Sequence, residues 1–503
     1  MIKGFVALVG AGPGDIGLLT LKGMEYIKRA DVVVYDRLVS DEILQLASFE
    51  SKKINVGKEP KKHLVPQNEI NTILLNHALE GKLVVRVKGG DPFVFGRGAE
   101  ELELLRENDV PFEVVPGITT AISVPAYAGI PVTHRDFSSS VHVITGNKKN
   151  NGQLELDFNL LASIGGTLVF LMSVSSLKQI LDGLLNAGMD KNMPASIIEN
   201  GTTPYQRKVV GTIENLFDKA QNKKIKAPSI VVVGEVCRFS QKLDWFSNRE
   251  LSGTNIIVTR PKASGGTLSL KLKELGANVI DYPCVEINQI SPNSLLKSVL
   301  EKISDYNWLV FTSKNGVSIF FDYMKNQKKD ARLLSDIKIA AVGKQTAQTL
   351  SDYGIIADYV PDVYAGTNLA EGLCKLTGEN EKILITRARD GNNEILDILK
   401  KNGRQYEDVP IYVTNYTNLQ SQKIKSIINE NPDLYVTFTS ASTVEGFVKT
   451  GQESELNNII GICIGSQTAK LAEKYGINHY VAKEATIDSM IETIRKLENE
   501  NNK

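Results

Sequence analysis

Residues 87–102 carry the groups in this sequence that are best suited to hold a small ligand. The run reads VKGGDPFVFGRGAEEL; it follows the apolar segment 83–87, and a helix-forming stretch begins after Gly98. Gly89 and Gly90 let the main chain approach a ligand because they carry no Cβ atom. Ligands of open α/β sheets bind beyond the carboxyl ends of the strands, so we expect a binding site here.

A second group of candidate residues lies in the other half of the chain, where hydroxyl side chains follow apolar strands. Ser313 and Ser440 each follow the dipeptide FT, and Thr346 and Thr468 lie in two GxQTA turns. Such oxygens can cap helices, and helix starts facing a common cleft would bind several carboxylates. Plain helix capping without a ligand is the alternative.

The elements that must position the first group alternate between strand and helix. Strands are predicted at FVALV, VVVY, INV, LVVRV and FEVV within residues 5–115, with helices near 18–29, 41–47, 67–80 and 99–107. This alternation favours a parallel sheet with crossover helices. A second α/β segment spans 116–237, with strand candidates VHVIT, TLVFL, ASIIE and SIVVVG, and the polar stretch 238–254 follows it as the main boundary.

The second half of the chain contains an internal repeat. VTRP at 258–261 returns as ITRA at 385–388, DYPCV at 281–285 as DVPIY at 408–412, and FTSKNGV at 311–317 as FTSASTV at 438–444, each 127 residues later. AVGKQTA and CIGSQTA continue the series at a separation of 122. The period is far longer than that of solenoid repeats. We therefore expect two related α/β lobes with a cleft between them.

Composition restricts the class of protein. The chain has 503 residues, 42% hydrophobic and 23% charged, which predicts several globular domains. Lys plus Arg and Asp plus Glu both number 58, so the chain has no net charge with which to bind nucleic acid. No apolar run is long enough to cross a bilayer. Any acidic ligand must then be held by local groups.

The amino terminus and the cysteines predict a cytoplasmic protein. The chain enters a strand at once with GFVALVG, which leaves no room for a secretion signal. The four cysteines are far apart and lie mostly in apolar contexts. We expect them to be reduced core residues, with neither a disulfide nor a bound metal.

The glycine-rich segment VGAGPGD at residues 9–15 allows two interpretations. Together with Asp36 after the next strand, it is superficially similar to a dinucleotide-binding fingerprint. That fingerprint needs GxGxxG, whereas here Gly10, Gly12 and Gly14 alternate and Pro13 interrupts the run. A nicotinamide-dependent oxidoreductase fused to a two-lobed solute-binding module therefore remains as the rival hypothesis.

Taken in order, VGAGPGD, VVYDRLVS, NVGK, VKGGDPFVFGRGAEEL, VVPGIT and GIPVTHRD closely resemble the motifs of the uroporphyrinogen-III C-methyltransferases, in the tetrapyrrole methylase family. The resemblance covers about residues 4–237. It implies a tetrapyrrole methylase fold of two α/β lobes and S-adenosylmethionine as the methyl donor. It also implies methylation of uroporphyrinogen III at C2 and C7 to precorrin-2, which feeds siroheme or cobalamin synthesis. A methylase of the same fold acting on another tetrapyrrole stays open.

The resemblance also assigns roles to individual residues of this chain. The donor is expected to contact Pro13, Gly89, Gly90, Asp91, Val94, Thr119, Thr120, Met172 and Gly201. The positions considered proton acceptor and donor in the family are Asp36 and Lys58, and those near the tetrapyrrole are Arg97, Glu100 and Arg135. The guanidinium of arginine suits the acetate and propionate groups of such a substrate. The plainer alternatives are a solvated loop lysine for Lys58 and surface ion pairs for the two arginines.

The duplicated half, about residues 254–497, resembles uroporphyrinogen-III synthase through VTRP, FTSKNGV, the IGSQTA turn and Tyr412 in VPIYVT. That resemblance implies that hydroxymethylbilane binds in the cleft, loses water, inverts ring D and closes to uroporphyrinogen III. Tyr412 is expected to assist departure of the hydroxyl, with Ser313, Thr346, Ser440 and Thr468 contacting the substrate. A strand tyrosine that simply packs in the core is the alternative.

The joint expectation is a bifunctional, cytoplasmic enzyme whose carboxyl-terminal half makes the macrocycle that the amino-terminal half methylates. The predicted domains are a methyltransferase at 1–240, with lobes 1–115 and 116–240, a linker at 241–253 and a synthase at 254–503. The synthase family implies one lobe from 254–285 plus 413–497 and another from 286–411. The methyltransferase family further implies a homodimer through the first half.

Overall fold

The part of the chain that the structure describes contains four β-sheets of five strands each. The structure is a computed structural model and describes residues 3–57, 65–147, 154–260, 262–417, 421–431, 434–449 and 453–501. The chain divides into unit 1, which is Met1–Gly253 with Leu275–Asn278, and unit 2, which is Thr254–Glu274 with Val279–Lys503. No helix among the described residues is long and apolar enough to cross a membrane.

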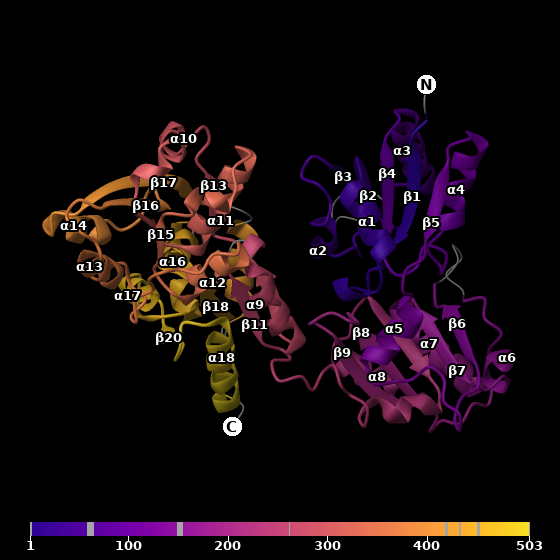
Figure 1. Ribbon diagram of the computed structural model, residues 1–503. Coiled ribbons are helices and arrows are strands. Elements are labelled where there is room, and N and C mark those ends of the chain that lie inside the picture. Colours follow the sequence, from indigo (N-terminus) through magenta and orange to yellow (C-terminus); the bar gives the residue numbers. More distant parts are fainter. Residues whose placement is uncertain are drawn as a thin grey trace. The chain divides into compact units, whose positions relative to one another are not determined.

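The first lobe of unit 1 is the expected parallel sheet, with the strand order β3-β2-β4-β1-β5 (Figure 1). Its strands are β1 (Phe5–Gly10), β2 (Val32–Tyr35), β3 (Lys52–Asn55), β4 (Leu83–Lys88) and β5 (Phe112–Val115). Its helices are α1 (Leu21–Arg29), α2 (Asp41–Leu44), α3 (Gln67–Leu79) and α4 (Gly98–Glu107). Side chains of α1 and α2 pack in the core on one face and those of α3 and α4 in the core on the other. Burial on both faces explains the apolar runs of the central strands.

The order of these strands reverses between β1 and β4. The chain leaves β1 toward β2 on one side, whereas it leaves β4 toward β5 on the other. Such a reversal opens a crevice beyond the carboxyl ends of the two strands. The loops that start at Gly10 and Gly89 begin at this crevice.

The second lobe of unit 1 is a mixed sheet in the order β6-β7-β10-β8-β9. It contains β6 (Val141–Thr145), β7 (Thr167–Leu171), β8 (Pro194–Glu199), β9 (Arg207–Thr212) and β10 (Ser229–Val233), with helices α5 (Thr120–Tyr127), α6 (Phe158–Ser163), α7 (Leu177–Asn186) and α8 (Leu216–Asn222). Only β6 and β7 run parallel; the other neighbouring pairs are antiparallel. The four strands predicted from sequence are present. The edge strand β9 was missed because RKVVGT has too few apolar residues to signal a strand.

The two sheets of unit 2 confirm the internal duplication. One has the order β12-β11-β18-β19-β20 and the other the order β13-β17-β16-β14-β15. The strands are β11 (Asn255–Val258), β12 (Asn278–Asp281), β13 (Val285–Gln289), β14 (Trp308–Phe311), β15 (Lys338–Ala341), β16 (Lys382–Ala388), β17 (Gln405–Tyr416), β18 (Leu434–Phe438), β19 (Ile459–Cys463) and β20 (His479–Val481). Under the repeat spacing, β12, β11, β18 and β19 correspond to β17, β16, β14 and β15, which are neighbours in the same order.

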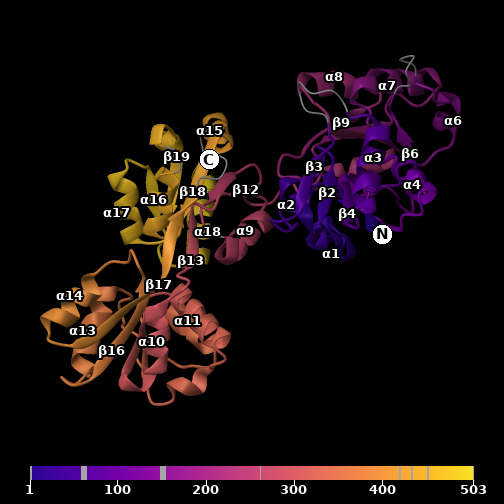
Figure 2. The ribbon, with the colours of Figure 1, turned by 90° about the horizontal axis from the view of Figure 1, so that it is seen from above.

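Each sheet of unit 2 combines the first part of one repeat with the second part of the other. The chain passes between the sheets after β12 and again after the long strand β17, which Figure 2 shows extending from one sheet toward the other. The helices are α9 (Lys262–Glu274), α10 (Ser294–Glu301), α11 (Lys314–Asn326), α12 (Lys344–Asp352), α13 (Gly366–Leu376), α14 (Glu394–Lys401), α15 (Ser421–Glu430), α16 (Ala441–Lys449), α17 (Ser466–Lys474) and α18 (Ile487–Asn501). The starts of α11 and α16 follow equivalent strands, which sets up the site described below.

Candidate functional site

Three loops at the carboxyl edge of the first sheet are joined by main-chain contacts. The amide of Gly12 donates to the carbonyl of Gly90 at 3.2 Å, and the amide of Gly90 donates back to the carbonyl of Gly12 at 2.7 Å. Asp91 Oδ2 accepts from the amide of Gly117 at 3.0 Å, which ties in the loop after β5. The segments after β1, β4 and β5 are therefore joined to one another by hydrogen bonds.

Glycine is required where these loops meet because they approach so closely. A Cβ on Gly117 would lie 2.2 Å from the carbonyl oxygen of Gly90, and one on Gly10 would lie 2.5 Å from the Cα of Gly117. Gly90 has a φ of +67°, while a Cβ there would have no neighbour nearer than 3.8 Å. Gly90 is buried, so its positive φ, rather than a steric clash, is what favours glycine at this position. Loops of this kind fit a ligand that is held by backbone groups.

The loop after β1 reaches the second lobe of the same unit. The amide of Asp15 donates to Oγ1 of Thr202 at 3.2 Å, and the hydroxyl of Tyr127 donates to Asp15 Oδ2 at 2.9 Å. Pro13 and Gly201, both predicted donor contacts, flank this junction in sequence. A Cβ on Gly201 would lie 2.3 Å from the side chain of Val124, so the close packing requires glycine there.

Other predicted donor contacts line the start of α5. Thr119 caps this helix by accepting from the amide of Ala121 at 3.3 Å, and Thr120 is the first helical residue. Val94 comes from the first lobe and packs, partly buried, against a core cluster of the second lobe. The structure therefore brings these three positions to the boundary between the two lobes of unit 1.

A pocket of about 740 Å³ opens beside these loops. It is lined by Phe93, Phe95, Arg97, Gly98, Ala99, Glu100, Thr145, Asn147, Leu154, Glu155, Leu156 and Met172. This pocket brings together Arg97 and Glu100, predicted near the tetrapyrrole, and Met172, predicted to contact the donor. Arg97 donates to both carboxylate oxygens of Glu100, at 2.9 and 2.6 Å, and this bidentate pair is largely exposed.

Several residues at this pocket hold an uncommon backbone conformation. The φ angles of Phe95, Arg97 and Met172 are +54°, +57° and +53°, and Thr202 near the donor loops has +66°. Positive φ is costly for residues other than glycine, most of all for a β-branched threonine, and it concentrates at functional sites. A positive φ points a side chain differently from the usual negative φ, so it sets the orientation of Phe95, Arg97 and Met172 at the pocket.

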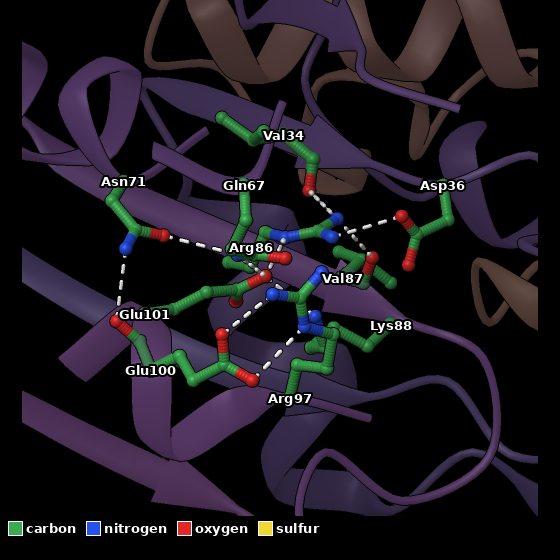
Figure 3. Close-up of polar contacts among 10 residues, drawn as sticks. All are labelled: Val34, Asp36, Gln67, Asn71, Arg86, Val87, Lys88, Arg97, Glu100 and Glu101. Atoms are coloured by element: carbon green, nitrogen blue, oxygen red, sulfur yellow. Dashed lines mark hydrogen bonds and ion pairs between the residues drawn. The ribbon is translucent and has the colours of Figure 1, made fainter. Parts of the chain in front are cut away.

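In the first lobe of unit 1, Arg86 is the centre of a buried polar network (Figure 3). Its side chain is only 2% exposed, although it belongs to the apolar strand β4. Nη2 donates to Asp36 Oδ1 at 2.8 Å, Nε donates to Glu101 Oε1 at 3.3 Å, and Nη1 donates to the carbonyl of Val87 at 3.1 Å. The carboxylate of Asp36, the predicted proton acceptor, is therefore held in place by a buried guanidinium.

Glu101 connects this arginine to a second buried cation. Lys88 Nζ donates to Glu101 Oε1 at 2.6 Å, and Gln67 Nε2 donates to the same oxygen at 3.2 Å (Figure 3). Burial and the neighbouring Arg86 lower the pKa of Lys88. The other carboxylate oxygen of Glu101, Oε2, is buried without a hydrogen-bond partner. The carboxylate of Glu101 thus forms ion pairs with both Arg86 and Lys88, so much of the charge balance of the network depends on it.

Apart from Asp36, the residues of this network were not among the predicted site residues. Arg86 and Lys88 alternate with Val85 and Val87, so both project to the same face of an apolar strand. Charges at strand positions where burial is expected are a signal of buried ion pairing. Glu101 lies in the helix that packs on that face, but its depth of burial could not be read from AEELELLRE.

Not all of the predicted first-half residues can be placed at this pocket. Arg135 is exposed in the turn between α5 and β6, and it is not among the residues that line the pocket with Arg97. Lys58 lies outside the described residues. The structure therefore supports a pocket role for Arg97 and Glu100 but places Arg135 apart from them.

Unit 2 has a pocket of about 350 Å³ at its predicted hydroxyl-rich strand ends. Its lining residues come from both sheets and are Arg260, Val285, Ile287, Ser313, Lys314, Asn315, Gln345, Thr346, Tyr412, Thr414, Thr439, Ser440, Ser442 and Thr443. Four of the predicted positions, Ser313, Thr346, Tyr412 and Ser440, are brought together here. Thr468 is buried on α17 and does not line the pocket.

Tyr412 and Ser313 form the central contact of this pocket. Their hydroxyl oxygens lie 2.8 Å apart, and Ser313 also caps α11 by accepting from the amide of Gly316 at 3.1 Å. Tyr412 is only 7% exposed, and burial raises the pKa of its phenol. The neutral phenol of Tyr412 can therefore act as a hydrogen-bond donor to an oxygen in the pocket.

The hydroxyl residues are not all helix caps. Ser440 caps α16 as predicted, because its Oγ accepts from the amide of Thr443 at 3.4 Å. Thr346 and Thr468 instead lie inside the first turns of α12 and α17, whose caps are Gly343 and Gly465. The prediction that they cap these helices was wrong, since the glycine of each GxQTA turn takes the cap position.

The structure also argues against a dinucleotide site in VGAGPGD. A pyrophosphate site needs a helix that starts within the glycine-rich turn. Here a single 3₁₀ turn, Ile16–Leu18, follows the glycines, and α1 starts only at Leu21 with Thr20 as its cap. The loop contacts the second lobe instead, as described above.

Comparison with known proteins divides the chain in the same way. Residues 6–216 match the family of tetrapyrrole (corrin/porphyrin) methylases, and residues 266–492 match the family of the uroporphyrinogen-III synthase HemD. Among solved structures, a uroporphyrin-III C-methyltransferase from Thermus thermophilus complexed with S-adenosyl homocysteine is 41% identical in sequence. It covers 47% of this chain and 99% of its own length, with a TM-score of 0.41.

Relatives that match over nearly the whole chain include proteins from two bacteria. The porphyrin biosynthesis protein HemD of Ruminiclostridium josui is 52% identical, and the match covers 99% of each chain. A uroporphyrinogen-III C-methyltransferase of Bacillus subtilis is 35% identical over 93% of each chain. The chain therefore belongs to the family of the porphyrin biosynthesis protein HemD, with a tetrapyrrole methylase in its first half and a uroporphyrinogen-III synthase in its second.

Proposed function

We propose that this chain is a bifunctional enzyme of tetrapyrrole biosynthesis that closes hydroxymethylbilane to uroporphyrinogen III and then methylates the product at C2 and C7 to precorrin-2. The observation that carries the proposal is that each unit holds a pocket built from the motif residues of its own family. The pocket of unit 1 combines Arg97 and Glu100 with Met172, and that of unit 2 combines Tyr412 with Ser313.

The methyl donor is S-adenosylmethionine, and the glycine loops of unit 1 fit such a group. A Cβ on Gly90 would have no neighbour nearer than 3.8 Å, whereas Cβ atoms on Gly10 and Gly117 would collide with neighbouring backbone. Pro13, Gly89, Gly90, Asp91, Val94, Thr119, Thr120, Met172 and Gly201 would hold the donor. When bound, it supplies a methyl group on a sulfonium centre, which a nucleophilic carbon can attack.

The residues of unit 1 position the acceptor and remove a proton. Arg97 binds carboxylates of the tetrapyrrole through its planar guanidinium. Asp36, oriented by Arg86, accepts the proton that leaves the ring after methylation, and Lys58 is the proposed proton donor. A carboxylate that is already held in position and orientation lowers the activation free energy of proton transfer.

Unit 2 carries out the ring closure. Its pocket is rich in hydroxyl and amide groups, which suit the carboxylates of a linear tetrapyrrole. Tyr412 donates its hydroxyl proton toward the departing hydroxyl group, which leaves as water, and Ser313 orients Tyr412. Ser440, Thr346 and Thr468 complete the proposed substrate contacts.

The assignment places the methyltransferase at 1–240, the linker at 241–253 and the synthase at 254–503, with its lobes at 254–285 plus 413–497 and at 286–411. A cytoplasmic homodimer that associates through the first half is part of the proposal, on the strength of the family resemblance. Sedimentation velocity of the full chain and of a variant truncated after residue 253 tests the dimer: a monomer in either case contradicts it.

The activity is tested by incubating the purified chain with hydroxymethylbilane, with and without S-adenosylmethionine. We expect the type III isomer in both reactions and a mass gain of two methyl groups only with the donor. Absence of the type III isomer rejects the synthase, and absence of the mass gain with added uroporphyrinogen III rejects the methyltransferase. Supplying other tetrapyrroles in parallel tests whether the acceptor is a different one.

A further inference from the structure

The pocket of unit 2 contains two positive charges that form no ion pair with a carboxylate among the described residues. Arg260 and Lys314 both line it and are half-buried, and its other lining residues carry hydroxyl, amide or aliphatic side chains. No Asp or Glu is among them. A half-buried cation normally lies near an anion, because removal from water is costly without one.

The pKa shifts of the two cations are those expected of positive charges that lack a nearby anion. Burial lowers the pKa of Arg260, and burial together with the positive charge of Arg260 lowers that of Lys314. Among the described residues, neither side chain forms an ion pair with a carboxylate. Two like charges are therefore kept close together in a pocket that excludes part of the solvent.

The internal repeat provides a built-in comparison for Arg260. Its equivalent is Arg387, 127 residues later in ITRA. Arg387 Nε and Nη2 donate to the two carboxylate oxygens of Asp408, at 2.8 and 2.9 Å. Nη2 also donates to Asn393 Oδ1, and Nη1 donates to the carbonyl of Gly391. The second arginine is thus fully satisfied within the protein.

The same groups around Arg260 have diverged. Asp281, the equivalent of Asp408, accepts from Ser269 and lies 3.8 Å from Lys273 rather than pairing with Arg260. Lys314 corresponds to Ala441, so only one repeat carries the second cation. The two equivalent arginines therefore differ: Arg387 forms an ion pair within the protein, whereas Arg260 lines a pocket beside Lys314.

We propose that Arg260 and Lys314 form a binding site for paired carboxylates, and that this site sets the affinity of unit 2 for its substrate. The inference rests on the proposed synthase function. Each pyrrole of the substrate carries an acetate and a propionate on adjacent carbons, so one ring presents two carboxylates that match two adjacent cations. Anchoring one ring in this way leaves Tyr412 in the same pocket free to contact the reacting end.

The test compares charge-removing variants in the full chain. R260Q and K314Q should each raise the KM for hydroxymethylbilane about tenfold or more, with kcat changed by less than about twofold, since binding rather than chemistry is lost. R260K should recover part of the loss. K297Q, which removes an exposed lysine on α10 outside the pocket, should keep the wild-type KM.

Binding of uroporphyrin III, a stable polycarboxylate probe, is measured alongside by fluorescence quenching. Its dissociation constant should rise in R260Q and K314Q, and raising the salt concentration should weaken wild-type binding more than binding to either variant. R387Q should instead lower the melting temperature of unit 2, because it leaves Asp408 unpaired.

The outcomes separate this inference from the function on which it rests. If the wild-type chain makes no type III isomer, the synthase function fails. If the wild type is active and the folded R260Q and K314Q variants keep its KM and its affinity for uroporphyrin III, the carboxylate site is rejected while the function stands. A loss of kcat alone in both variants also rejects it.

Discussion

In unit 1 the buried cations Arg86 and Lys88 share the carboxylate of Glu101, whereas in unit 2 Arg260 and Lys314 line a pocket that holds no carboxylate among its described residues. Both pairs sit at sites that should meet the same kind of acidic ligand. The difference teaches that a buried cation can have two uses. Where the protein supplies the anion, Arg86 also holds the carboxylate of Asp36, the proposed proton acceptor. Where it does not, the cation can bind the carboxylates of the proposed substrate.

Removing the shared anion of unit 1 is the strongest test of this contrast. Glu101→Gln leaves two buried cations with only the partly exposed Asp36, and we expect unit 1 to lose about 3–5 kcal/mol of stability. Methylation should be lost with it. In scanning calorimetry the transition of unit 1 should move to lower temperature while that of unit 2 stays.

Glu103→Gln is the matched control, since Glu103 is exposed on the same helix α4. It should change the stability by less than about 0.5 kcal/mol. If Glu101→Gln is equally mild, Glu101 does not neutralise the network, and the contrast between the two units is lost.

The next test separates positioning from chemistry in unit 1. Asp36→Asn keeps the shape of the side chain that Arg86 holds but removes its capacity to accept a proton, so methylation should fall about a hundredfold or more. Cyclisation by unit 2 should be unchanged, as measured by the yield of type III isomer. A parallel loss of both activities in a folded variant would contradict separate sites.

In unit 2, Tyr412→Phe removes a hydroxyl rather than a charge. Cyclisation should fall about tenfold because one hydrogen bond to the departing group is lost, while methylation of added uroporphyrinogen III persists. Since burial raises the pKa of Tyr412, the phenol stays protonated at least up to its usual pKa of about 10. The rate of cyclisation below that pH should then show no step from Tyr412, and a step that disappears in the variant would refute its role as a neutral donor.

Much of the fold follows from the sequence because the patterns are local. Apolar runs such as FVALV and TLVFL predict buried strands, and the 127-residue repeat predicts the shared strand order of the two sheets of unit 2. The weak strand β9 was missed because its apolar content is low. Thr346 and Thr468 were placed as helix caps, whereas a glycine three residues earlier holds that position.

The site is less predictable, since it depends on contacts between distant segments. Motif residues such as Gly90, Arg97 and Met172 could be named in advance, but the buried chain from Asp36 through Arg86 to Glu101 could not. It requires the register of β2 with β4 and the packing of α4 on the sheet. The opposite states of Arg260 and Arg387 are likewise invisible in VTRP and ITRA, because their partners lie elsewhere in the chain.

The smallest expected effect concerns the exposed ion pair of Arg97 with Glu100 in unit 1. This pair is intermediate between the buried ion pairs of unit 1 and the pocket cations of unit 2. Arg97 is paired with Glu100, but both side chains are about half exposed, so the pair should add less than about 1 kcal/mol to stability. Arg97→Gln should therefore leave the melting temperature unchanged and raise the KM for uroporphyrinogen III about tenfold, as measured by initial rates of methylation. Arg106→Gln, an exposed change on the same helix, is the control and should keep the wild-type KM. An unchanged KM in Arg97→Gln would mean that Arg97, like Arg387, is satisfied by its own carboxylate, and recognition of acidic groups by free cations would then be confined to unit 2.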